Sequence, residues 1–256
     1  MEKMNPLDLQ KVRAFVNENI DDFHQRKLAS VQNLTLARLL TKNPYLFRAK
    51  NINSAGELIA GLLDAFLSSS EEKLFGDFLE GLAVFVAGLT CNGHKSAAQG
   101  IDLEFINNNT HYIVSIKSGP NWGNSSQHKK LAQDLRDGVT RIRQSRTALN
   151  IQPVLGICYG KTRSAFTREG YLKVVGQNFW YLISENPDLY TDIIDPIGYR
   201  AKEHNEQFIV GRAALENRLT GEFISAYCDS SGAINWERFV QANSKNLDLD
   251  KLLSKH

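Results

Sequence analysis

The sequence predicts an α/β fold in which a mixed central β-sheet is flanked by helices, with helical additions at both ends. Two short runs, 100–106 and 111–117, alternate apolar and polar side chains, which is typical of strands. The segment 153–159 is almost continuously apolar, as in a strand buried on both faces. The segments before and after these runs carry helical spacing and helix-start signals. Together these patterns predict helices, a hairpin, a helix, two strands and more helices.

The first third of the chain is predicted to be helical. Residues 6–69 carry apolar side chains near helical spacing, with an interruption at Pro44. Two capping-box patterns predict helix starts, Ser54 with Glu57 and Ser69 with Glu72. The second start predicts a separate helix that runs to about Gly88.

The remaining elements complete a division into three regions. Residues 127–149 are polar and basic and are predicted to form a helix, and a further strand is expected at 171–175. Gly176 then leads into a short helix whose Phe179, Trp180 and Tyr181 we expect in the core. We therefore expect a helical N-terminal region at 1–69, a core at 70–185, and a helical C-terminal region at 186–256 as the candidate for dimerisation.

The hairpin at 100–117 carries charge where a buried strand would not. If Asn108 and Asn109 form the turn, residues whose numbers sum to 217 face each other. Asp102 then lies opposite Ser115, and Lys117 is its diagonal neighbour on the same face. Ile101, Leu103 and Phe105 are expected on the other, apolar face. The charged face admits two interpretations, a solvated surface with an incidental ion pair or a catalytic surface.

Composition limits the class of protein. The chain has 256 residues and a net charge of +2, so the overall charge says nothing about nucleic acid. Three widely spaced cysteines argue against a disulfide framework and favour a reducing cytoplasm. No run is expected to span a membrane. The local charge is more informative, because six lysines and arginines stand against two aspartates between His128 and Arg146.

These motifs resemble a known superfamily. Asp102 near the start of one strand, followed by Ser115-Ile116-Lys117 near the end of the next, resembles the PD-(D/E)XK nuclease signature. The order of elements resembles that superfamily's αβββαβ core, as in restriction endonucleases. The later segments VLGICYG, GQNFWYLIS and SSGAINWERF look like a group of type II restriction endonucleases. The resemblance covers roughly residues 71–240.

The resemblance implies a Mg²⁺-dependent enzyme that hydrolyses phosphodiester bonds of double-stranded DNA at a short, specific and usually palindromic site. A two-fold site favours a homodimer, and a cognate methyltransferase would act on the same site. Asp102 and the carbonyl of Ile116 are the implied metal ligands. Lys117 would orient or deprotonate the attacking water, or stabilise the charge that develops at phosphorus.

One position departs from the superfamily pattern. Ser115 stands where an acid is expected, so another carboxylate must supply the missing charge. The candidates are Glu104 on the adjacent strand, Glu80 or Asp77 on the preceding helix, and Asp134 on the following helix.

DNA contacts are expected from basic and amide side chains near the hairpin. Phosphate binders are expected to be Lys129, Lys130, Arg141 and Arg143. The loop that follows Lys117 would reach base edges through Asn121, Trp122 and Asn124. Lys161 and Arg163 are alternatives. Two rival interpretations stay open, a repair or junction nuclease of the same superfamily and a DNA-binding module without catalysis.

Overall fold

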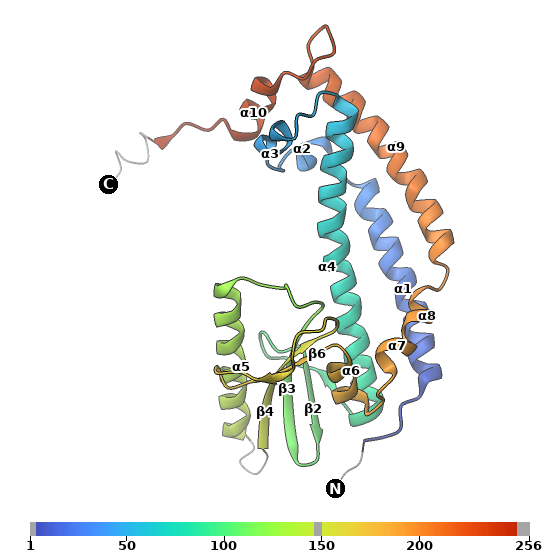
Figure 1. Ribbon diagram of the computed structural model, residues 1–256, viewed down its shortest axis with the longest axis vertical. Coiled ribbons are helices and arrows are strands. Elements are labelled where there is room, and N and C mark those ends of the chain that lie inside the picture. The colour runs from blue at the N-terminus through green and yellow to red at the C-terminus, as the bar shows by residue number, and fades with distance from the viewer. Residues whose placement is uncertain (1–3, 146–149, 250–256) are drawn as a thin grey trace. The chain divides into compact units, whose positions relative to one another are not determined.

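A computed structural model describes residues 4–145 and 150–249 of the chain (Figure 1). The chain forms two compact units, each built from two stretches of sequence. The first, here called the sheet unit, comprises Met1–Phe23 and Lys73–Ala201. The second, the helical unit, comprises His24–Glu72 and Lys202–His256.

The sheet unit contains a six-stranded mixed sheet with the spatial order β1-β2-β3-β4-β6-β5. Strands β3, β4 and β6 are parallel, and the other neighbouring pairs are antiparallel. In chain order the strands are β1 (His94–Lys95), β2 (Leu103–Asn107), β3 (Thr110–Lys117), β4 (Asn150–Ile157), β5 (Ala165–Phe166) and β6 (Leu172–Val175). The predicted mixed α/β class is confirmed. The sequence missed β1 and β5 because two residues are too few to show an alternation.

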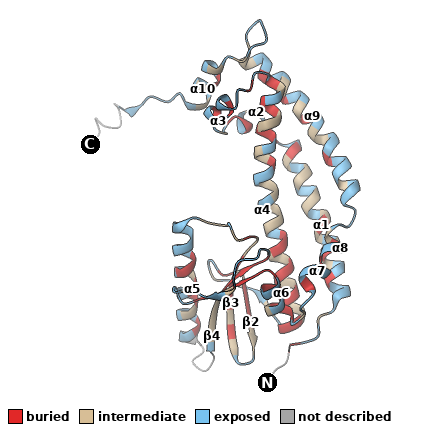
Figure 2. Cartoon of the chain, in the orientation of Figure 1, coloured by how far each residue is buried: buried red, intermediate tan, exposed pale blue. Residues whose placement is uncertain are grey.

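Helices cover both faces of this sheet. On one face pack α1 (Leu9–Gln32), α4 (Ala55–Cys91) and α6 (Gln177–Ser184), whose apolar side chains share a core with Leu103, Phe105 and Val114 of the hairpin. On the other face packs α5 (Ser125–Ser145), whose Leu131 and Leu135 lie in one cluster with Ile113. Two four-residue helices follow α6, namely α7 (Leu189–Asp192) and α8 (Ile194–Ile197). Figure 2 shows buried residues in the strands and along α4.

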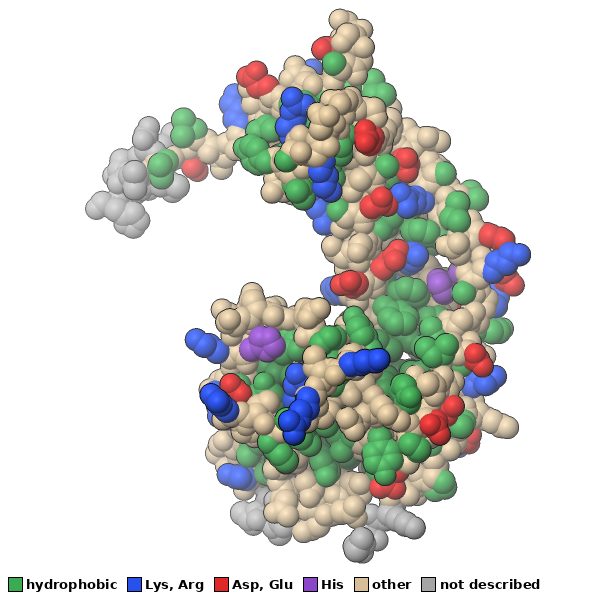
Figure 3. Space-filling view, viewed as in Figure 1, with side chains coloured by type: hydrophobic (Ala, Val, Ile, Leu, Met, Phe, Trp, Pro, Cys, Tyr) green, Lys and Arg blue, Asp and Glu red, His purple; other side chains and the backbone are tan. Residues whose placement is uncertain are grey.

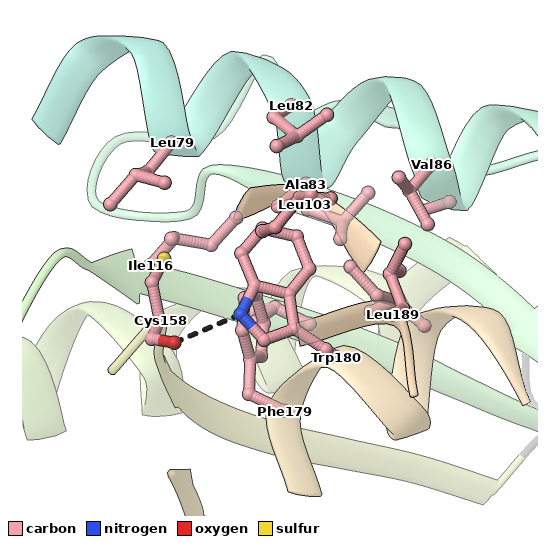
Figure 4. Close-up of a cluster of buried hydrophobic side chains, with 14 of the residues drawn as sticks. Leu79, Leu82, Ala83, Val86, Leu103, Ile116, Cys158, Phe179, Trp180 and Leu189 are labelled. Carbon is pink, nitrogen blue, oxygen red and sulfur yellow. Dashed lines mark hydrogen bonds between the residues drawn. The ribbon is translucent and has the colours of Figure 1, made fainter. Parts of the chain in front are cut away.

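Phe179 and Trp180 hold α6 against the sheet, as expected, whereas the expectation that Tyr181 lies in the core is wrong. Phe179 and Trp180 are buried, whereas the neighbouring Tyr181 is half exposed. The Trp180 indole N–H donates a hydrogen bond of 2.9 Å to the carbonyl of Cys158, just past the end of β4 (Figure 4). Phe179 lies over Gly156 so closely that a Cβ there would come within 2.3 Å of its ring. Gly156 is therefore required by close packing.

The predicted helix start at Ser69 is wrong. Ser54 does begin a helix, because its Oγ accepts a hydrogen bond of 3.1 Å from the backbone N–H of Glu57. That helix, α4, then continues without a break to Cys91. The Ser69 hydroxyl donates back to the carbonyl of Ala65 and so is satisfied within the helix. The residues before α4 form α1, α2 (Leu36–Leu39) and α3 (Pro44–Ala49), and Pro44 begins α3.

Two smaller expectations also change. The helix predicted at 127–149 begins at Ser125 and is described to Ser145, and the expectation for 146–149 lies outside the described residues. Ile101 does not share the face of Leu103 and Phe105, because it precedes β2 and packs in the cluster beneath α5. The strand alternation therefore holds only from Leu103 onward.

The length of α4 bears on the expectation that no segment spans a membrane. The 37 residues of α4 are long and apolar enough to cross a membrane, judged by length and composition alone. This was not predicted from the sequence. Much of its apolar surface packs instead against other elements of each unit. Residues up to Glu72 belong to the helical unit and the rest to the sheet unit.

The helical unit has its own core. Its other long helix is α9 (Ala201–Tyr227), and α10 (Trp236–Ser244) follows a turn at Gly232. The side chains of Phe223 and Phe239 are fully buried and meet edge to face, with ring centroids 5.7 Å apart. The side-chain carbonyl of Asn235 caps α10 by accepting from the backbone N–H of Arg238.

Replacing Trp180 with Phe should destabilise the protein by about 1–3 kcal/mol, because the buried carbonyl of Cys158 loses its indole donor. Urea unfolding measures the free energy. Tyr181→Phe, on the next and half-exposed position of α6, is the matched control and should leave stability nearly unchanged. Equal stability of Trp180→Phe and the wild type would contradict this assignment.

Candidate active site

The hairpin folds in the predicted register. Asn108 and Asn109 both have positive φ, 47° and 59°, as a two-residue hairpin turn of this type requires. Glu104 pairs with Ile113, and Leu103 with Val114, so the facing residues sum to 217. Asp102 is thereby brought to the end of β3 that carries Ser115 and Lys117.

Asp102 is fixed by both its backbone and its side chain. Its N–H donates to the carbonyl of Val114 (2.8 Å), and its carbonyl accepts from the N–H of Ser96 (3.3 Å). Its Oδ2 accepts a short hydrogen bond of 2.6 Å from the backbone N–H of Ile116, and the Ser115 hydroxyl lies 3.4 Å from the same oxygen. The carboxylate therefore has a defined position at the edge where the hairpin opens.

Lys117 lies between an acid and an aromatic ring. Its Nζ is 3.9 Å from Oδ2 of Asp102 and 5.7 Å from the centroid of the Trp122 ring. The side chain is about one-third exposed, so its ammonium group is oriented and still reaches solvent. Asp102 and Lys117 thus form the predicted acid–lysine pair.

Glu80 lies on the face of α4 that runs past the end of β3. A Cβ on Gly76 would be 3.7 Å from the side chain of Ser118, the residue after Lys117. Glu80 is one helical turn further on and shares that face. Its carboxylate is paired with Lys95 of β1, at 3.1 Å between Oε1 and Nζ. Glu80 does not simply face solvent, since its side chain is only 27% exposed.

Glu104, the other leading candidate for the second acid, has three partners of its own. Its Oε1 accepts hydrogen bonds from the Ser96 hydroxyl and from Nη2 of Arg141 (3.2 Å). Its Oε2 lies 3.1 Å from Nε2 of His111. Burial raises the pKa of Glu104, but the Ser96 hydrogen bond and the attraction of His111 and Arg141 outweigh it, so the pKa lies below its usual range. The carboxylate ties β2, β3 and α5 together.

The polar face of the hairpin is not a solvated surface. Ile113 and Ser115 on that face are almost fully buried, and α5 packs over it. This excludes the interpretation in which the charged face simply meets water. Charge there is instead confined to Glu104, with its partners, and to the open end at Asp102 and Lys117.

The remaining acids occupy other positions. Asp134 pairs with Lys130 along α5 and lies against Gly100, where a Cβ would come within 2.5 Å of its Oδ2. Asp77 is exposed on α4, and its charge acts on Lys95 together with those of Glu80 and Asp102. The charges of Glu80, Asp77 and Asp102 therefore all act on Lys95 and raise its pKa.

The residues expected to contact DNA fall into two groups. The exposed side chains for which the described part of the chain shows no ion pair are Asn121, Lys129, Arg143, Lys161 and Arg163. The others are engaged: Lys130 binds Asp134, Arg141 binds Glu104, and Trp122 packs against His128. Oδ1 of Asn124 caps α5 by accepting from the N–H groups of Ser126 and Gln127. Figure 3 shows lysine and arginine side chains gathered over α5 and the loop after β4.

A cavity of about 960 Å³ lies beyond the ends of β4 and β6. Its lining includes Phe75, Trp180 and Cys158, together with the loop residues Lys161 and Arg163. Burial raises the pKa of the Cys158 thiol far above its usual range; the charge of Glu80 adds to this effect and that of Lys117 opposes it. The N–H of Cys158 donates to the carbonyl of Lys117 (2.9 Å), so the cavity adjoins the Lys117 end of β3.

The donor set at this end suits a hard divalent cation. Within residues 4–145 and 150–249, no three His, Cys, Asp or Glu side chains come together in a way that could hold a metal. Mg²⁺ needs only one or two carboxylates, because it retains waters and binds substrate phosphates. Oδ1 of Asp102 and the carboxylate of Glu80 supply oxygens of that kind.

Lys95, Ser96 and His111 were missed by sequence reasoning. Lys95 and Glu80 are 15 residues apart on different elements, and β1 is too short to be recognised. His111 is the partner of Glu104 only because the hairpin register brings them near each other. The register itself was predictable, so His111 could have been found from it.

The family assignment follows from a comparison with known protein families. The profile of the family described as type II restriction endonuclease EcoO109I matches residues 10–205. This match covers most of the chain and places the protein among the type II restriction endonucleases, which are nucleases that act on DNA. The chain belongs to the EcoO109I family. No curated protein matches it closely enough to count as a relative.

Replacing Glu104 with Gln should cost about 1–3 kcal/mol of stability at neutral pH, because three partners lose a charged acceptor. The pKa of Glu104 in the folded protein is lowered, so this contribution is complete above the usual pKa of about 4.5 and is lost as the pH falls through the folded pKa. The difference from wild type, measured by urea unfolding, should therefore shrink below about pH 4. Exposed Glu18→Gln is the control, and a difference independent of pH would refute the argument.

Proposed function

We propose that the protein is a Mg²⁺-dependent type II restriction endonuclease that cleaves double-stranded DNA at a short, specific and palindromic site. The observation that carries the proposal is the pairing of Asp102 with Lys117 at the open end of the hairpin, in a chain of this family. The proposed catalytic core is of the PD-(D/E)XK type, and the antiparallel hairpin followed by two parallel strands supports it.

Asp102 and Glu80 would hold the metal ion, with the carbonyl of Ile116 as a third oxygen. Once bound, the ion would supply an activated water and neutralise charge on the phosphate. Asp102 suits this role because the Ile116 N–H and the Ser115 hydroxyl hold one of its oxygens in place. Ser115 is thus a donor that orients Asp102, and it leaves the second acid to Glu80.

Lys117 would act directly at the phosphate. Its ammonium group is held near Asp102 and remains in contact with solvent, where a phosphate oxygen can approach. From this position it orients the attacking water and stabilises the negative charge that develops at phosphorus. The Trp122 ring lies below the ammonium group of Lys117, and this cation–π contact would limit the movement of the lysine side chain.

Affinity for DNA would come from the exposed basic residues around this end. Lys129 and Arg143 on α5, and Lys161 and Arg163 after β4, are exposed and suited to phosphates. Asn121, with Trp122, is the candidate for base contacts. Arg141 contributes less, because it is held by Glu104.

The biological setting completes the proposal. A palindromic site requires two-fold symmetry, so the active form would be a homodimer, with residues 186–256 as the candidate for subunit contact. A cognate methyltransferase would protect the same site without binding this chain. The enzyme would work in the cytoplasm, in keeping with three cysteines that form no disulfide.

Cleavage of phage-sized duplex DNA tests the catalytic assignment. The wild type should give discrete fragments with Mg²⁺ and none with EDTA. Asp102→Ala and Lys117→Ala should each lower the cleavage rate by at least about 10²-fold, because each removes a group that acts in the reaction. Glu80→Gln should have a similar effect, whereas the exposed Glu18→Gln should cleave normally.

The products separate the rival functions. Preference for nicked or branched DNA over plain duplex would favour a repair or junction nuclease. Intact DNA with a retained gel shift would leave a binding module and overturn the endonuclease.

A double variant, Lys129→Ala with Arg143→Ala, tests the DNA surface. The logarithm of the affinity decreases as the logarithm of the salt concentration rises. If both side chains bind phosphates, this decrease should become shallower by about 2 in slope, and the cleavage site should not change. Fluorescence anisotropy with a labelled duplex in Ca²⁺ measures the slope. Lys11→Ala, which removes an exposed lysine paired with Asp8, is the control. An unchanged slope would exclude these two residues from the DNA surface.

A further inference from the structure

Lys95 places a cation among the acids of the candidate active site. Its Nζ lies 3.1 Å from Oε1 of Glu80, so β1 is tied to α4 by this pair. In the sheet Lys95 pairs with Leu103, the residue after Asp102. The hydrogen bond to Glu80, followed by the charges of Glu80, Asp102 and Asp77, raises the pKa of Lys95. Lys95 is thus the direct partner of Glu80 and lies near Asp102 through the β1–β2 pairing.

The Lys95–Glu80 ion pair differs from the ion pairs of Glu104 in its exposure to solvent. Glu104 is buried and has three partners, so its interactions are costly to break. The side chain of Lys95 is 72% exposed and extends from a strand of two residues. An ion pair with one partner this exposed contributes little to stability. The Lys95–Glu80 pair can therefore open at little cost.

We propose that Lys95 is an internal counter-ion that occupies Glu80 in the free protein and is drawn away by the DNA backbone, which releases Glu80 to the metal. The inference rests on the proposed function, because it takes Glu80 and Asp102 as the metal ligands. An ammonium group and a divalent cation compete for the same carboxylate oxygen. A phosphate of bound DNA offers Lys95 another anion, so substrate binding and metal binding strengthen each other.

Metal binding without DNA is the first test, with Mn²⁺ as the probe and titration calorimetry as the measurement. Lys95→Gln removes the charge and should tighten Mn²⁺ binding on the order of tenfold, because two carboxylates lose their counter-ion. Lys95→Arg retains the charge and should bind as the wild type does. The control is Lys11→Ala, an exposed and acid-paired lysine of the same unit. Equal Mn²⁺ affinity of Lys95→Gln and wild type would overturn the inference.

The second test measures how far DNA binding raises the affinity for Mn²⁺. A duplex that contains the cleavage site, with one non-bridging oxygen of the scissile phosphate replaced by sulfur to slow cleavage, should raise the Mn²⁺ affinity of the wild type. In Lys95→Gln this gain should be smaller, because Glu80 is already released. The same gain in both proteins would overturn the inference.

The two hypotheses fail in distinguishable ways. Suppose that Asp102→Asn abolishes Mn²⁺ binding and cleavage, while Lys95→Gln changes neither the Mn²⁺ affinity nor its gain on DNA binding. The endonuclease proposal then stands and the counter-ion role of Lys95 falls. If the wild type neither binds Mn²⁺ nor cleaves DNA, the proposed function and the inference both fall.

Discussion

The candidate active site depends on one hydrogen bond, from the backbone N–H of Ile116 to the carboxylate of Asp102. The ladder between β2 and β3 ends at this point, because the chain turns away at Ile101, whose N–H bonds to Ala98 instead. The side chain of Asp102 thus takes the place of a backbone acceptor on the neighbouring strand. A buried N–H without a partner would be costly, so this substitution fixes the carboxylate as firmly as the sheet itself. Lys117 follows on the same strand and is positioned against it.

The two glutamates near the candidate site differ in their environment. Glu104 is buried and accepts from a hydroxyl and a guanidinium and pairs with the buried imidazole of His111, so releasing it would break three interactions at once. Glu80 is partly exposed and held by one flexible lysine. The proposed role of metal ligand requires a carboxylate that can exchange its partner, and of these two glutamates Glu80 suits that role better. Sequence alone could not separate the two, because their partners Lys95, His111 and Arg141 come from other elements.

The parts of the fold that were predictable are those that local sequence controls. The Asn-Asn turn and the period of two in the strands determine the hairpin register, and with it the meeting of Asp102, Ser115 and Lys117. The capping box at Ser54 was reliable for the same reason. The apparent start at Ser69 was not, because a cap forms only where the preceding residues leave the helix, and the apolar pattern of α4 keeps them in it. Partners that come from other elements, such as Arg141 on Glu104 or Lys95 on Glu80, required the tertiary structure.

The basic charge of α5 illustrates why the number of charges on a helix is a poor measure of DNA affinity. Lys130 and Arg141 are already neutralised by Asp134 and Glu104, so part of the local excess seen in the sequence serves the fold. Arg141 does more than neutralise, because it anchors α5 to β2 two residues from Asp102. A phosphate bound to the exposed lysines of α5 would therefore act on a helix that is tied to the hairpin. Under the proposed function, this tie would give DNA held by α5 a defined position relative to Asp102 and Lys117, which cleavage at a fixed place in a site requires.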